Sequence, residues 1–374
     1  GFDEPWSIYK AEELFKNVAD KNHPMETVLT IIQGKGTLPR EQAGRNIHYD
    51  DASLANYKKV EQGDFIIHLR SFEGGLEMAN EDGIVSPAYT ILRCKKPHSS
   101  LFYEAYFHTD EFINHILSKS VEGIRDGRQI SYEAFKWLGL PYCDVSEQER
   151  IAQLFCTLSH RIEKQQQMVD ALKKYKRGVV AAIFSHQLKF SDATGKPYPE
   201  WTSCTLQDAV DFLDGQRKPL ESADRAKRQG QYPYYGASGI IDYIDDFIFD
   251  EPLLLLGEDG ANILNRSTPL CFIAEGKYWV NNHAHVMRPK AGQNIKFLCE
   301  LLESLDYTRY NTGTAQPKLN QDKCRRIGLA LPVYEEQCHI ADFLSAFDQR
   351  TDKAQSILDY LLSNRDGLLQ QLFI

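Results

Sequence analysis

Apolar residues recur at alternating gaps of three and four positions in two segments of the chain, residues 151–183 and 340–372. This is the a/d pattern of a heptad repeat, and it is sustained over about five heptads, which short amphipathic helices do not achieve. The pattern predicts two long helices that pack on each other as a coiled coil. At about 1.5 Å per residue, each helix would span roughly 55–60 Å. The apolar seam positions are Ile151, Phe155, Leu158, Ile162, Val169, Leu172, Val179 and Ile183, then Ile340, Leu344, Phe347, Ala354, Leu358, Leu361, Leu368 and Leu372, with Gln165, Lys176, Thr351 and Arg365 as polar members.

The two segments are copies of one sequence pattern. Residues 147–152 read Glu-Gln-Glu-Arg-Ile-Ala, residues 336–341 read Glu-Gln-Cys-His-Ile-Ala, and the match continues at a constant offset to Phe184 and Phe373. A Leu-Pro pair precedes each copy, and Ser146 followed by Glu149 has the form of a helix capping box. The shared register argues against two unrelated surface helices.

Charge differs between the two copies. Residues 147–189 carry eight basic and four acidic side chains (net +4), whereas residues 335–374 carry three basic and seven acidic ones (net −4). Opposite charges on two copies of one pattern favour their mutual attraction.

The segments before the two copies share a mixed α/β plan. Each starts with a short helix near a tryptophan, continues through apolar strands separated by Gly and Asp, and ends with a helix and a polar loop. A shared scaffold with divergent loops is how one fold carries two specificities. The sequence therefore predicts two copies of an α/β (α+β) domain joined by two long helices. The predicted domains are residues 1–143 and 190–331, the predicted helices are residues 144–189 and 332–374, and single later strands are expected at 85–93 and 280–288.

Composition places the protein among ordinary globular chains. The eight cysteines are scattered, with no Cys-x-x-Cys pair, which argues against a zinc ribbon or a disulfide framework and suits a reducing cytoplasm. No apolar run approaches the roughly 18 residues that a membrane span requires. The first six residues lack an initiator Met and show no secretory signal. We expect a cytoplasmic protein with no membrane partner.

Motifs for catalysis are absent from the sequence. There is no Gly-x-x-x-x-Gly-Lys-Ser/Thr loop, no His-Glu-x-x-His, no Gly-x-Ser-x-Gly elbow and no Asn/Asp-Pro-Pro-aromatic motif of an adenine methyltransferase. His283 and His285 alternate as on one face of a strand, but no Cys or acidic ligand lies at a usable spacing for a metal. The sequence therefore predicts a non-catalytic protein without a metal site.

Over essentially its whole length, the chain resembles the specificity subunits of type I restriction–modification enzymes. The resemblance rests on the repeated Leu-Pro…Glu-Gln-x-x-Ile-Ala helix entries, on Gly-Thr-Ala-Gln-Pro-Lys-Leu-Asn at residues 313–320, and on the linker at residues 195–201. Residues 84–89 and 235–239 are also similar to target-recognition domains. One departure is the loop at residues 123–131, which lacks the Thr-Ala-Gln form of the second half.

The resemblance implies a non-catalytic subunit in which each domain is a target-recognition domain for one half of a bipartite double-stranded DNA target. Because the two domains differ, the target would be asymmetric, and an antiparallel helix pair would set the spacing between its halves. Two methyltransferase subunits would dock on the helices and restriction/motor subunits would join them. S-adenosylmethionine, ATP and Mg would belong to those partners, with no cofactor in this chain. The proposed docking residues are Ile151, Phe155, Leu158, Ile340, Leu344 and Phe347.

Base reading requires side chains that form two hydrogen bonds at once, such as Arg or Lys with guanine and Asn or Gln with adenine. Polar loops supply such candidates in both domains, and the basic run at residues 217–228 is a candidate for phosphate contact. The candidate DNA-binding residues are Arg70, Ser71, Phe72, Gly74, Tyr89, Arg125, Arg128 and Gln129 in the first domain, and Tyr234, Tyr235, Ser238, Asn262, Arg266, Asn282, His283, Gln316, Lys318 and Asn320 in the second.

Two other functions fit parts of the same pattern. One is a coiled-coil adaptor whose α/β modules bind protein or carbohydrate, and the other is a self-contained enzyme. A steep fall of DNA affinity with salt, measured with a methyltransferase subunit present, separates the DNA-binding subunit from the adaptor. An enzyme would have to show turnover by the isolated chain.

Overall fold

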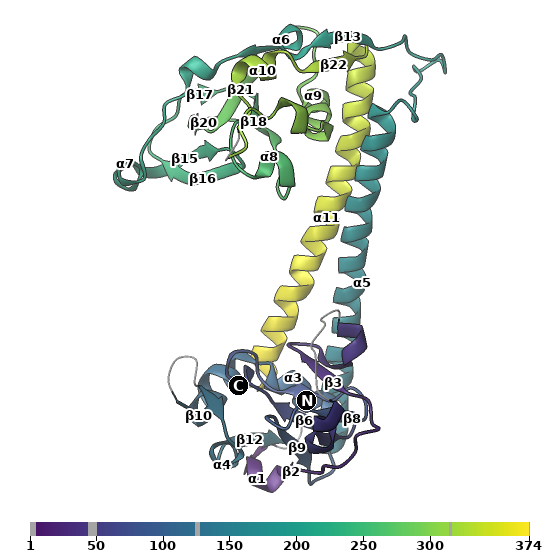
Figure 1. Ribbon diagram of the computed structural model, residues 1–374, viewed down its shortest axis with the longest axis vertical. Helices are drawn as coiled ribbons and strands as arrows, with labels where there is room; N and C mark the ends of the chain where they lie inside the picture. Colours follow the sequence, from purple (N-terminus) through teal and green to yellow (C-terminus); the bar gives the residue numbers. More distant parts are fainter. Residues whose placement is uncertain (1–4, 44–50, 124–127, 314–315, 374) are drawn as a thin grey trace. The chain divides into compact units, whose positions relative to one another are not determined.

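The structure is a computed structural model that describes residues 5–43, 51–123, 128–313 and 316–373. The chain forms two compact units, the first of residues 1–167 and 355–374 and the second of residues 168–354. The long helices α5 (Val145–Phe184) and α11 (Tyr334–Phe373) each contribute residues to both units (Figure 1).

The first unit is built on a four-stranded antiparallel sheet. Its order is β2 (Phe15–Val18), β9 (Thr90–Cys94), β6 (Phe65–Ile67) and β7 (Glu77–Met78). Helix α3 (Ser100–Phe107) packs on the sheet, and its Phe107 ring lies 4.9 Å from that of Phe65. The remaining strands form four antiparallel pairs, namely β1 (Ser7–Lys10) with β12 (Gly139–Tyr142), β3 (Leu29–Ile32) with β4 (Gly36–Pro39), β5 (Lys58–Val60) with β8 (Gly83–Val85), and β10 (Val121–Glu122) with β11 (Gln129–Ile130). The unit also has three short α-helices, α1 (Ala11–Leu14), α2 (Ser71–Gly74) and α4 (Tyr132–Phe135).

The second unit repeats this plan and adds a second sheet. Strands β14 (Val210–Phe212), β21 (Ala284–Pro289), β18 (Leu253–Gly257) and β19 (Cys271–Ala274) form a sheet in that order, and α9 (Ile295–Ser304) packs on it. Strand β18 is buried along its whole length, as an apolar central strand requires. The other elements are the sheet β16 (Gly239–Ile244), β15 (Gln229–Gly236), β20 (Lys277–Val280), β17 (Phe249–Asp250), the pair β13 (Thr202–Thr205) with β22 (Gly328–Leu331), and α6 (Leu206–Ala209), α7 (Ser222–Lys227), α8 (Asn262–Asn265) and α10 (Gln321–Arg325).

The predicted later strand of each domain is in fact two strands separated by a turn. In the first unit Val85 ends β8, a Ser86–Tyr89 turn follows, and β9 begins at Thr90. In the second unit Val280 ends β20 and β21 begins at Ala284. The single-strand prediction was wrong because the turn residues, including Pro87, interrupt backbone pairing although the flanking residues are apolar.

The long helices pair antiparallel, as predicted from the heptads and the family resemblance. In the first unit the rings of Phe155 and Phe373 stack at 6.3 Å, and in the second unit the rings of Tyr175 and Phe347 lie 5.6 Å apart. Residue numbers therefore increase along α5 in the direction in which they decrease along α11. Every predicted seam position is buried or half-buried, which confirms the a/d assignment.

Buried glutamines explain why the helix entries are repeated. The amide of Gln148 accepts from Ser99 N at 3.0 Å and donates to Cys143 O at 2.9 Å. The amide of Gln337 accepts from Asn294 N at 2.9 Å and donates to Pro332 O at 3.0 Å. Each glutamine therefore joins the start of a long helix to the strand end and the helix start of its own domain.

The cap of α5 differs from the capping box expected at Ser146. The helix begins at Val145, and the carboxylate of Asp144 accepts from the backbone N of Ser146 at 2.9 Å. Asp144 is the better cap because its charge also faces the positive end of the helix dipole.

Candidate DNA-recognition surfaces

In the second unit, four loop segments that are distant in sequence lie side by side. Backbone hydrogen bonds join Asn281 N to Tyr235 O (3.0 Å), Glu258 N to His283 O (2.8 Å) and Leu319 N to Glu258 O (2.7 Å). The polar loops of residues 235–238, 257–262, 281–285 and 316–320 therefore form one surface, which we call the second reading surface. Each of the four loops contains residues predicted from the sequence to contact DNA.

Six predicted readers are exposed on the second reading surface: Ser238, Asn282, His283, Gln316, Lys318 and Asn320. Two are held by acidic neighbours, since His283 Nδ1 lies 2.8 Å from Asp259 Oδ2 and Lys318 Nζ lies 3.3 Å from Glu258 Oε1. The side chain of Asn320 also caps α10 by accepting from Lys323 N. Amide, ammonium and imidazole groups on adjoining loops are the donors and acceptors that base edges require.

Asn311, which was not among the predicted residues, holds Gly313 and Lys318 in place. Asn311 Oδ1 accepts from Gly313 N at 3.0 Å and from Lys318 N at 2.8 Å. Gly313 has no room for a side chain, because a Cβ there would lie 1.7 Å from Gln316 O. The short polar side chain followed by glycine is typical of such turns and was the available signal.

Several predicted readers of the second domain make contacts that stabilise the fold, and one of them is buried. Tyr234 is fully buried and its hydroxyl accepts from Leu220 N at 2.9 Å, so it is removed from the candidates. Tyr235 is half-buried, with its ring 5.7 Å from Phe272 and 5.6 Å from Tyr278. Arg266 ends α8 in a left-handed conformation (φ 51°) and pairs with Glu303 at 2.7 Å, while the Asn262 amide donates to Thr268 O at 3.0 Å.

The basic run at residues 217–228 is largely neutralised. Arg217 pairs with Glu258 at 2.8 Å, Arg225 with Asp242 at 3.1 Å and Arg228 with Asp245 at 2.8 Å. The acidic partners come from segments far along the chain, so the run as read from the sequence exaggerated the positive charge available to phosphates.

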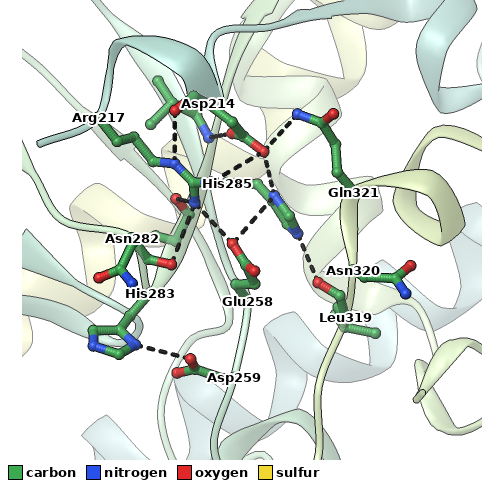
Figure 2. Close-up of polar contacts among 12 residues, drawn as sticks. Asp214, Arg217, Glu258, Asp259, Asn282, His283, His285, Leu319, Asn320 and Gln321 are labelled. Atoms are coloured by element: carbon green, nitrogen blue, oxygen red, sulfur yellow. Dashed lines mark hydrogen bonds and ion pairs between the residues drawn. The ribbon is translucent and has the colours of Figure 1, made fainter. Parts of the chain in front are cut away.

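Beneath the second reading surface lies a buried ionic cluster around His285 (Figure 2). His285 Nδ1 lies 2.7 Å from Asp214 Oδ2 and 3.7 Å from Glu258 Oε2, and Nε2 lies 2.7 Å from Leu319 O. Burial lowers the pKa of His285, but hydrogen bonds to Asp214 and Cys324 outweigh it and raise the pKa to about 10. Burial raises the pKa of Asp214, yet the hydrogen bond and charge of His285 hold it below its ordinary value. The ring is therefore an imidazolium at neutral pH.

In the first unit, the predicted readers gather around α2. Arg70 is exposed, and the guanidinium of Arg128 lies 4.3 Å from the centre of the half-buried Phe72 ring. Gln129 is exposed on β11, and Tyr89 is half-buried with its ring 6.5 Å from that of His68. We call Arg70, Phe72, Arg128 and Gln129 the first reading surface. Arg125 lies outside the described residues.

Two predictions around α2 need correction. Ser71 is fully buried and its Oγ accepts from His68 N at 2.9 Å, which leaves it unavailable to DNA. Gly74 ends α2 and Gly75 follows with a positive φ of 86°. A Cβ would lie 2.0 Å from Gln33 Nε2 on Gly74 and 2.0 Å from Phe107 O on Gly75, so both glycines permit close packing within the unit.

The predicted docking residues are mostly used inside the chain. Ile151, Phe155, Ile340 and Leu344 are buried in the cores of their units, and Leu158 and Phe347 are half-buried in the helix seam. Seam side chains are therefore the wrong choice for partner contact. The exposed large apolar residues of the two helices are different side chains, namely Leu154, Met168, Tyr175, Tyr334, Ile357 and Tyr360.

Neither a metal cluster nor a membrane span is found in the part of the chain that the structure describes. No group of three or more His, Cys, Asp or Glu side chains there has an arrangement that could hold a metal ion. No helix among the same residues is long and apolar enough to cross a membrane.

Part of this chain is similar in sequence to known proteins. Residues 198–361 match the sequence profile of the type I restriction modification DNA specificity domain. S.HindORF215P of Haemophilus influenzae and EcoprrI of Escherichia coli, both named as type I restriction enzyme specificity subunits, are 32% and 28% identical over 155 and 154 residues. These matches cover 41% of this chain, but only 38% and 37% of the lengths of the two relatives.

A solved structure extends the similarity of fold to the whole chain. The S subunit of a type I restriction–modification system from M. genitalium aligns over 100% of this chain and 97% of its own, with a TM-score of 0.62 at 15% identity. The second reading surface lies within the residues that match the specificity domain. Residues 198–361 are therefore similar to the type I restriction modification DNA specificity domain, and the whole chain has the fold of a solved S subunit from a type I restriction–modification system.

Proposed function

We propose that this chain is the sequence-specificity subunit of a type I restriction–modification complex and that each domain reads one half of an asymmetric, bipartite double-stranded DNA target. One observation carries the proposal: residues 198–361 match a DNA specificity domain, and exposed Asn, Gln, His and Lys side chains of that domain lie on adjoining loops. Such side chains form the hydrogen bonds that distinguish base pairs in the major groove. The target is asymmetric because the two reading surfaces carry different side chains.

The helix pair sets the spacing between the two halves of the target and docks the partners. Helices α5 and α11 run without interruption and contribute to both compact units. Two methyltransferase subunits bind their exposed faces, and restriction/motor subunits join this assembly. This chain is non-catalytic, and S-adenosylmethionine, ATP and Mg act in the partner subunits.

The net charge of −9 bears on how the chain binds DNA. An acidic protein repels the phosphate backbone, which supplies much of the affinity of DNA-binding proteins. The chain alone therefore binds DNA weakly, and the methyltransferase subunits supply the remaining positive surface.

Methylation mapping tests the proposal directly. Genomic DNA from cells that carry the complete complex should be methylated at one bipartite, asymmetric motif. Exchange of residues 190–331 for the recognition domain of another specificity subunit should change one half of that motif and leave the other half unchanged. Methylation that persists without this chain, or a change in both halves after the exchange, contradicts the proposal.

A further inference from the structure

We propose that the buried His285–Asp214 ion pair positions the loop of residues 316–320 on the second reading surface, so that His285 is a positioning residue for base discrimination in one half of the target. This inference rests on the proposed function, because it assigns a role within the DNA-reading site.

The geometry requires both ring nitrogens of His285 to donate. The carbonyl oxygen of Leu319 can only accept, and it lies 2.7 Å from Nε2. Asp214 Oδ2 lies 2.7 Å from Nδ1 and is a carboxylate oxygen that also accepts from Gln321 Nε2 at 2.7 Å. Only an imidazolium has two N–H donors, and with 1% of its side chain exposed His285 exchanges no hydrogen bonds with bulk water.

The same hydrogen bonds hold the loop of residues 316–320 in place through its buried residue. Leu319 is fully buried, its carbonyl accepts from His285, and its N–H donates to Glu258 O at 2.7 Å. Its neighbours Lys318 and Asn320 are both exposed. Because consecutive residues in an extended segment point to opposite faces, holding Leu319 inward holds its two neighbours outward.

Asp214 anchors both sides of this arrangement. Its Oδ1 accepts from Val286 N at 2.9 Å, on the strand that carries His285, and its Oδ2 binds Gln321, immediately after the reading loop. Glu258, from the adjoining loop, binds Arg217 at 2.8 Å and Lys318 at 3.3 Å. Two carboxylates, with 7% and 13% of their side chains exposed, thus face three cations, so the cluster has no uncompensated negative charge beneath a surface that receives DNA.

Replacement of His285 by glutamine tests the inference. A neutral amide can donate to Leu319 O or to Asp214 but does not reproduce two charged N–H donors at the ring positions. In the purified complex, the affinity of His285→Gln for the mapped target and for duplexes with single base-pair changes is compared with that of the original complex. We expect discrimination to fall about tenfold at one or more positions in the half read by the second domain. Discrimination in the other half, and affinity for unrelated DNA, should stay the same.

Glu303→Gln is the matched control. Glu303 belongs to the same unit and holds the backbone N–H groups of Leu270 and Cys271 at 2.9 Å, with no contact to residues 316–320 among the described hydrogen bonds and ion pairs. If general loosening of the unit were the cause, Glu303→Gln would impair discrimination as His285→Gln does, and the inference would be overturned. It is also overturned if His285→Gln discriminates normally or loses discrimination in both halves.

A spectroscopic measurement on the full chain is independent of DNA. In ¹⁵N-histidine-labelled protein at pH 8, the His285 signals, assigned through His285→Gln, should show protons on both ring nitrogens. A neutral ring overturns the inference while leaving the proposed function untouched. Conversely, if the original complex shows no sequence discrimination at all, the proposed function fails and the inference fails with it.

Discussion

Phe373, in the last turn of α11, packs edge-on against Trp6 with ring centroids 5.7 Å apart. The second unit repeats this relationship, because Phe184 in the last turn of α5 packs edge-on against Trp201 at 6.2 Å. Each long helix therefore ends in the core of the domain that precedes the other helix. Phe373 is a core residue of a domain to which its helix is not adjacent in sequence, whereas Phe184 is half-buried against the core of the domain that follows its helix.

Truncation of Phe373 should destabilise the first unit selectively. The Phe373 ring also lies 5.3 Å from Phe102, so Phe373→Ala leaves a cavity in an aromatic core and should cost about 3–5 kcal/mol. Hydrogen exchange should accelerate in α3 far more than in α9. Tyr360→Ala, at a side chain that is 66% exposed, is the control and should change neither. Equal acceleration in both helices would show that the two cores do not respond separately.

Lys176 should contribute to helix pairing through its two acidic partners. Its Nζ lies 2.6 Å from Glu300 and 2.7 Å from Asp348, and although burial lowers its pKa, these hydrogen bonds raise it above the ordinary value. Lys176→Met leaves two carboxylates without their cation, and we expect a loss of about 1–3 kcal/mol in the free energy of unfolding measured with urea. The exposed Lys173→Met should lie within about 0.5 kcal/mol of the original chain. If Lys176→Met behaves the same way, the ion pairs do not stabilise the helix pair.

The His285 ion pair predicts a loss of stability in alkaline solution. Because the folded state raises its pKa from 6.5 to about 10, its stabilising contribution is complete below pH 6.5 and is lost as the pH rises through about 10. The free energy of unfolding should therefore fall more steeply between about pH 7 and pH 10 in the original chain than in His285→Gln. Other groups titrate in this range, so the quantity to measure is the difference between the two slopes. Parallel curves would show that His285 does not carry a raised pKa.

Lys318 and Asn282 should affect DNA binding in different ways. Lys318→Ala removes one cation, so affinity should fall for unrelated as well as target sequences and the slope of log affinity against log salt should decrease by about 1. Asn282→Ala should instead reduce discrimination at one base pair by about 1–3 kcal/mol, with an unchanged salt slope. Binding titrations at two salt concentrations, with the methyltransferase subunit present, measure both quantities. Affinity that does not depend on salt in any variant would favour the protein-binding or carbohydrate-binding adaptor.

Insertion of one heptad into each long helix should change the spacer alone. Seven residues added after Gln167 in α5 and after Ala354 in α11 preserve the a/d seam, because a heptad returns each position to the same face. Methylation mapping should then find both half-sites unchanged and a different number of base pairs between them. A heptad inserted in α5 only is the contrasting variant, since α5 and α11 then no longer match in length and methylation should be abolished.

Local periodicity explains what could be predicted from the sequence. The heptads fix the seam because each position is determined by neighbours three and four residues away, and the long helices follow directly.

Two details of the fold were predicted wrongly because they depend on neighbouring elements. Asp144 rather than Ser146 caps α5 because the cap depends on where the preceding strand ends. The division of residues 85–93 into two strands depends on which partners those residues pair with across the sheet.

Long-range pairing explains what could not be predicted. Tyr234 was selected as an exposed reader, but β15 pairs with β16 on one side and β20 on the other, which buries it. His285 was passed over in favour of His283, although it is the one tied to Asp214 and Leu319. These partners lie 71 and 34 residues away from His285 along the chain, and no local pattern marks them.

The buried side chains of Gln148 and Gln337 affect how such proteins can evolve. Each glutamine side chain makes the same two hydrogen bonds to backbone atoms. Those of Gln148 end at Ser99 and Cys143, and those of Gln337 end at Asn294 and Pro332. Backbone groups are the same in every protein, so this joint does not depend on which side chains the adjoining domain carries. Mutation or recombination can therefore replace the variable loops, or a whole domain, while the replacement still attaches to the inherited helix.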